Sequence, residues 1–110
     1  MESISQSELV ERLSSIFPLF RAEWLADTEN SFPSTSLHWV YQSFLPWVSS
    51  VELSAKQLKA LALLLNAEVA AGGLRENAVG TCFLEHCRQV GLARRLSPLL
   101  SAAAKSRLHA

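Results

Sequence analysis

Glycine, proline and cysteine are scarce in this chain, and it has no long apolar run. Four glycines and four prolines among 110 residues provide few of the turns that an all-β fold needs. Two cysteines are too few for a secreted scaffold that depends on disulfides. The longest apolar run, 60–65, is far shorter than the about 20 residues that cross a bilayer. These shortages argue against all-β, disulfide-stabilised and membrane-spanning proteins.

Targeting and catalytic signatures are also missing. The first residues show neither the basic nor the apolar part of a secretory signal, so we expect a cytoplasmic protein. The chain contains no P-loop, no dinucleotide-binding glycine motif, no H-E-x-x-H and no G-x-S-x-G. A helical chain of this length has little room for a deep substrate cleft. The sequence therefore predicts a protein that is not an enzyme and needs no cofactor.

The formal net charge of zero conceals an uneven distribution of charge along the chain. Residues 1–53 contain seven acidic and two basic side chains, whereas residues 54–110 contain eight basic and three acidic ones. Nucleic-acid-binding domains are usually strongly basic overall, and a pI of about 6.8 does not fit them. We therefore expect a protein partner with an acidic surface, and neither a nucleic acid nor a membrane.

The residues that are abundant favour helices. Ser5 and Glu8 form a capping box that predicts a helix from residue 6, and Ser54 with Gln57 predicts another. No stretch shows the alternation of a strand. We expect one all-α domain, 1–110, with five or six helices, in which 55–71 and 74–90 form an antiparallel hairpin around two glycines.

Three prolines mark further helix boundaries. Pro18 is expected to open a short second helix, because proline is tolerated in a first turn. Pro46 lacks an amide donor, so it should kink or end the third helix near Leu45. Ser97 and Pro98 are expected to begin a last helix that continues to about Arg107.

The segment Cys-Phe-Leu-Glu-His-Cys, 82–87, is the one place that suggests chemistry. On a continuous helix Cys82 and Cys87 would lie about 140° apart and could not share a metal or a disulfide. Cys82, Glu85 and His86 would lie on one helical face, which supports the alternative of a small cysteine- or metal-dependent enzyme. We prefer the interpretation that both thiols are packing atoms of a buried helix, with no metal bound.

Two groups of residues are candidates for contact with a partner. Phe32, Trp39 and Trp47 lie off the apolar stripe of the third helix and could form an exposed aromatic anchor, unless later helices cover them. Arg94 and Arg95 follow a glycine, where complementing a helix dipole does not explain them. Such complementation does explain the remaining late cations, namely Arg88, Lys105 and Arg107. If the aromatic patch mediates self-association instead, the protein is a homodimer or larger homo-oligomer.

One resemblance gives the partner-binding hypothesis a concrete form. The segment 77–85, Asn-Ala-Val-Gly-Thr-Cys-Phe-Leu-Glu, resembles the closing part of a family of small all-helical bacterial proteins of uncharacterised function. The family has a Phe-Leu-Glu on its penultimate helix and an upstream helix similar to 37–45. Some members look like immunity proteins, which neutralise a toxin by covering its active surface. The resemblance implies an immunity- or antitoxin-like role, ends at Gly91, and assigns no functional residues.

Overall fold

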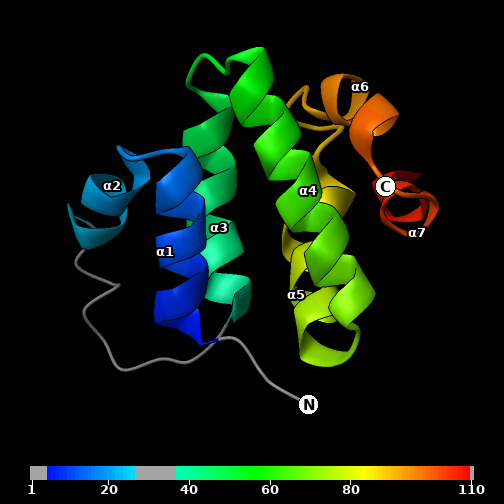
Figure 1. Ribbon diagram of the computed structural model, residues 1–110, viewed down its shortest axis with the longest axis horizontal. Helices are drawn as coiled ribbons and strands as arrows, with labels where there is room; N and C mark the ends of the chain where they lie inside the picture. Colours follow the sequence, from blue (N-terminus) through cyan, green and yellow to red (C-terminus); the bar gives the residue numbers. More distant parts are fainter. Residues whose placement is uncertain (1–4, 27–36, 110) are drawn as a thin grey trace.

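The computed structural model describes residues 5–26 and 37–109, and within them the backbone forms helices and turns without a strand (Figure 1). The α-helices are α1 (Gln6–Ile16), α2 (Phe20–Ala26), α3 (Leu37–Ser49), α4 (Ala55–Ala71), α5 (Gly73–Cys82), α6 (Ala93–Leu96) and α7 (Ala102–Lys105). In the same residues, the 3-10 helices η2 (Leu84–His86) and η3 (Ser97–Leu99) lie between α-helices, and η4 (Ser106–His109) follows α7. The all-α prediction is confirmed, although these residues form seven α-helices rather than five or six.

The two predicted capping boxes are both present. The Ser5 hydroxyl accepts the Glu8 amide at 3.1 Å, and the Ser5 amide donates to the Glu8 carboxylate at 3.2 Å. The Ser54 hydroxyl likewise accepts the Gln57 amide at 3.0 Å. Gly72 ends α4 with φ of +71°, a conformation that favours glycine. These helix ends therefore follow from local sequence alone.

The helices enclose one apolar core. In Figure 1, α1, α2 and α3 lie on one side, the α4 and α5 hairpin lies beside them, and α6 and α7 lie on the far side of the hairpin. The predicted core aromatics Phe17, Phe20, Tyr41 and Phe44 are all buried. The rings of Phe20 and Phe44 meet edge to face with centroids 5.0 Å apart, and Phe83 from the other side stacks on Phe44 at 5.7 Å.

Of the two effects predicted for Pro46, a kink or an end of the helix near Leu45, the second does not occur, because α3 continues through Pro46 to Ser49. Beyond the proline, Val48 is fully buried and the Trp47 ring lies 5.5 Å from that of Phe20. Full burial of Val48 contributes roughly 1.5–3 kcal/mol, and the partial burial of Trp47 adds to it, which offsets the about 3 kcal/mol that an internal proline costs. Tertiary packing therefore overrides the local signal.

The prediction of one helix over 74–90 is wrong, because α5 ends at Cys82. Phe83 leaves the helical conformation, with φ of −128° and ψ of −66°, and η2 follows. The consecutive residues Cys82, Phe83 and Leu84 are all buried. Helix α5 also buries three consecutive residues, but these are the small residues Ala78, Val79 and Gly80. On a continuous helix 82–84 would span about 200°, a wider arc than one apolar stripe, and Phe83 and Leu84 are bulky. The break in the helix lets all three side chains reach the core.

The predicted last helix is also divided. Leu100 is extended, with ψ of 148°, and Ser101 then caps α7 by accepting the Ala104 amide at 3.2 Å. The side chain of Asn66 on α4 holds this joint, accepting the Ser101 amide at 2.8 Å and donating to the Leu99 carbonyl at 3.3 Å. The C-terminal residues therefore fold back over α4 as short turns.

Candidate functional site

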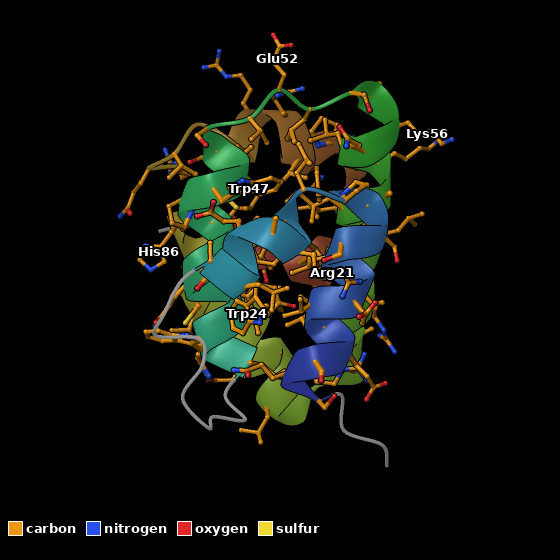
Figure 2. The ribbon with its side chains drawn as sticks, turned by 90° about the vertical axis from the view of Figure 1, so that its left-hand side faces the viewer. Arg21, Trp24, Trp47, Glu52, Lys56 and His86 are labelled. Carbon is orange, nitrogen blue, oxygen red and sulfur yellow. The ribbon has the colours of Figure 1, made fainter. Side chains whose placement is uncertain are left out.

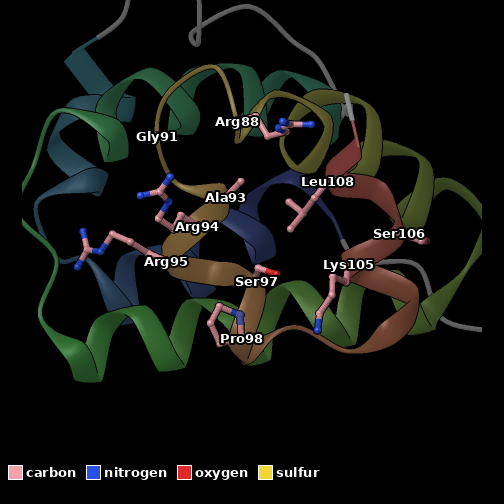
Figure 3. Close-up of a pocket in the computed structure, with 10 residues that line it drawn as sticks. All are labelled: Arg88, Gly91, Ala93, Arg94, Arg95, Ser97, Pro98, Lys105, Ser106 and Leu108. Atoms are coloured by element: carbon pink, nitrogen blue, oxygen red, sulfur yellow. The ribbon is translucent and has the colours of Figure 1, made fainter.

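An open cleft of about 940 Å³ lies at the C-terminal end of the fold, between the loop after η2 and the last two helical turns (Figure 3). We call it the basic cleft. Four of its side chains are cationic, and none of its lining residues is acidic. The lining residues are Arg88, Gly91, Ala93, Arg94, Arg95, Ser97, Pro98, Lys105, Ser106 and Leu108.

Three of these cations surround the middle of the cleft. In Figure 3, Arg88, Arg94 and Lys105 lie on three sides of Ser97 and Leu108, with the charged ends of Arg94 and Lys105 directed away from these two side chains. Arg95 turns outward, and its Nη2 donates to the Leu53 carbonyl at 3.3 Å. The basic cleft thus combines a cationic rim with a partly apolar floor.

The cations of the cleft carry charge that no carboxylate neutralises within the part of the chain that the structure describes. All ion pairs there involve other arginines: Arg12, Arg21, Arg75 and Arg107. The four cleft cations are exposed. Arginine binds carboxylate and phosphate through two parallel hydrogen bonds, and lysine binds them as a point charge. The cleft is therefore suited to an anionic ligand.

Backbone contacts hold the loop that leads into α6, the helix that carries Arg94 and Arg95. The Cys87 carbonyl accepts the amides of Leu92 and Ala93, at 2.9 and 3.3 Å. Gly91 makes the turn with φ of +81°, a conformation that a Cβ atom disfavours. Leu92 and Leu96 anchor the loop and α6 in the core. Arg94, between them, is left at the surface.

The structure separates the predicted partner-binding residues. Arg94 and Arg95 both line the basic cleft, whereas Trp39 and Trp47 lie on α3, half-buried and packed against the core. Figure 2 shows Trp47 beside α2, where its ring meets that of Phe20. Phe32 lies outside the described residues. The two tryptophans thus pack against the core and remain partly exposed, and their contact with a partner stays a prediction.

The expected common face of Cys82, Glu85 and His86 does not form, because α5 ends at Cys82. Cys82 Sγ accepts the Gln42 side-chain amide at 3.7 Å, and Glu85 binds Arg107 at 3.2 Å. His86 instead contacts Gln89 at 3.1 Å and points outward in Figure 2. A smaller pocket of about 300 Å³ is lined by Gln42, Leu45, Pro46, Cys82, His86 and Val90. No group of three or more metal-ligating side chains occurs in 5–26 and 37–109.

Neither thiol has the environment of a nucleophile. Burial raises the pKa of Cys87 to about 12, and its Sγ donates to the Phe83 carbonyl at 3.3 Å. Burial also raises the pKa of Cys82, opposed by the hydrogen bond from Gln42 and reinforced by Glu85. Both thiols are therefore protonated at neutral pH, whereas the thiolate is the reactive form. Their surroundings favour packing over catalysis.

Sequence reasoning missed two cations of the cleft. Arg88 had been explained as a late-turn residue, but α5 ends at Cys82, so it does not complement that helix. Lys105 does end α7, yet it also lines the cleft. The local density of basic residues was the signal that could have identified both. Only the fold shows that the segments carrying Arg88 and Lys105 line the same cleft.

None of the helices in the described part of the chain combines the length and hydrophobicity that crossing a bilayer requires. No protein-family model matches the chain, and no curated protein or solved structure matches it either. The resemblance to small bacterial immunity-like proteins therefore stays a prediction.

Proposed function

We propose that the protein is a non-catalytic binding module that receives an acidic segment of a partner protein in the basic cleft. The observation that carries this proposal is the set of exposed cations that no carboxylate pairs within the described residues. Glutamate or aspartate side chains of the partner would bind Arg88, Arg94 and Lys105. Apolar side chains of the same segment would contact Leu108 and Pro98 on the floor.

A protein ligand fits the charge distribution better than a nucleic acid. The chain has no net charge, and exposed carboxylates such as Glu8 on α1 and Glu23 on α2 lie on other parts of its surface. A nucleic acid extending beyond the cleft would meet them, and its affinity comes mainly from an extended basic surface. A short acidic segment needs only the cleft.

The mechanism would be steric. Charge complementarity accelerates encounter, and the bound module then covers part of the partner's surface. An immunity- or antitoxin-like role is the more specific form of this proposal, and a cytoplasmic location belongs with it. The arrangement of neighbouring genes tests that form, because an immunity protein is encoded beside its toxin, whereas an isolated gene in a metabolic operon would contradict it.

Binding of a fluorescein-labelled peptide rich in glutamate and leucine, followed by anisotropy, tests the proposal itself. The variant Arg94→Gln/Lys105→Gln should lose about tenfold in affinity if each charge contact contributes about 0.7 kcal/mol. Lys56→Gln/Lys59→Gln removes the same charge from α4 and should bind as the wild type does; Figure 2 shows Lys56 pointing into solvent. Equal losses in both variants, or tighter binding of a DNA of matched charge, would refute the proposal.

A further inference from the structure

The segment 82–87 adjoins the basic cleft without lining it. Its Cys87 carbonyl accepts the Leu92 and Ala93 amides and so holds the loop that forms one wall. Its Glu85 carboxylate binds Arg107, which belongs to the C-terminal segment (α7 and η4) that forms the opposite wall. One turn of the chain therefore contacts both walls.

Within the C-terminal segment, the Arg107 side chain points away from the cleft. Its neighbours Lys105, Ser106 and Leu108 line the cleft, whereas its guanidinium reaches α5 and the turn after it. Nη2 lies 3.2 Å from Glu85 Oε2, and Nη1 lies 4.0 Å from Glu76 Oε2. The side chain is about three-quarters shielded from solvent, at 26% exposure.

Gly80 on α5 makes room for this guanidinium. A Cβ at position 80 would lie 2.2 Å from Arg107 Nη2 and 2.4 Å from Cζ. Glycine inside a helix costs about 0.5–1 kcal/mol of stability relative to alanine. At position 80 this cost is offset by the space that glycine leaves for the Arg107 guanidinium. With any larger residue at position 80, Arg107 would have to leave its place.

We propose that Arg107 is a positioning residue, and that its contact with Glu85 across Gly80 sets the position of the cleft wall that carries Lys105. The effect of this contact on ligand binding rests on the proposed function, whereas its effect on the wall does not. The segment 82–87, which suggests a metal or redox site in the sequence, is thus a support for the cleft.

For Glu85→Gln, an electrostatic effect and a positioning effect predict opposite changes in affinity for the acidic peptide. This variant removes a negative charge near the cleft, so electrostatics alone would tighten binding of the acidic peptide. Loss of the Arg107 contact would weaken it by up to about fivefold, the equivalent of a partly exposed ion pair. Gly80→Ala changes no charge and should weaken binding similarly. Glu23→Gln, which removes one negative charge from the exposed surface of α2, and Thr81→Ala serve as matched controls that should not weaken it.

Amide hydrogen exchange of the C-terminal segment tests the positioning without any ligand. The amides of 105–108 should exchange faster in Glu85→Gln and Gly80→Ala than in the wild type and the two controls, while the core of α4 stays protected. Unchanged exchange in these two variants would overturn the inference, as would tighter peptide binding by Glu85→Gln. A wild-type protein that does not bind the peptide would refute the proposed function, and exchange would still decide whether Arg107 holds the wall.

Discussion

A carboxylate buried between three helices makes the sharpest prediction about stability. Glu68 on α4 is 1% exposed, and Arg75 on α5 binds it through two contacts, Nη2 to Oε2 at 2.5 Å and Nε to Oε1 at 3.1 Å. Arg12 on α1 approaches the same Oε2 at 3.7 Å. Glu68 therefore joins α1, α4 and α5, but its two arginines hold it unequally.

Removing each arginine in turn should show this inequality. Breaking a buried ion pair by deleting one partner costs about 3–5 kcal/mol, because the other charge stays buried. The Arg75 side chain is 21% exposed, so solvent screening lowers our expectation for Arg75→Met to about 3 kcal/mol. The Arg12 side chain is 49% exposed and its contact is longer, so Arg12→Met should cost less than about 1 kcal/mol.

Urea and thermal denaturation of both variants measure the difference. A gap of about 2 kcal/mol corresponds to roughly 8 °C in Tm for a domain of this size. The double variant Glu68→Met/Arg75→Met should be more stable than Arg75→Met alone, because it leaves no unpaired carboxylate in the core. Equal losses for Arg12→Met and Arg75→Met would refute the reasoning, since they would mean that burial and geometry do not decide the strength of these contacts.

Three further measurements follow from single side chains. The Tyr41 hydroxyl is buried without a hydrogen-bond partner among the described residues, so Tyr41→Phe should leave the free energy of unfolding unchanged or raise it by up to about 1 kcal/mol; a larger loss would reveal a partner. Native Cys87, with its pKa raised to about 12, should react with a thiol reagent at pH 8 far more slowly than denatured Cys87, and equal rates would contradict its burial. Because the folded pKa is the higher one, its stabilising contribution is complete below the unfolded value of about 8.5 and is lost as pH rises toward 12. Ser54→Ala should lower the free energy of unfolding by about 1 kcal/mol through loss of the α4 cap, and Ser54→Asp should retain it.

Local signals predicted the helix starts well because their partners lie within one turn. The Ser5 and Ser54 caps need only a residue three positions away, and both helices begin where these boxes place them. The ends of α3 and α5 were not predictable in this way. They depend on Phe83 and Trp47 packing against aromatic rings from distant parts of the chain.

Two features of the sequence do indicate buried arrangements that local signals miss. Cys82, Phe83 and Leu84 are three consecutive apolar residues that would span about 200° of a helix, a wider arc than one apolar stripe. Glu68 falls on the apolar stripe of α4 with Leu61 and Leu65, a position where a carboxylate needs a buried partner. Periodicity identifies such a residue, but it does not say that Arg75 is the partner.

The uneven charge of the chain has a structural meaning that the counts alone do not show. Two arginines of the basic half, Arg75 and Arg107, are occupied by carboxylates of that same half and hold helices together. The cations of the basic cleft take part in none of the ion pairs that the described residues form. Because the zero net charge is a sum over both classes and over the acidic half, it understates the field at the cleft. Arg94 and Lys105 therefore present a local positive surface that overall composition argues against.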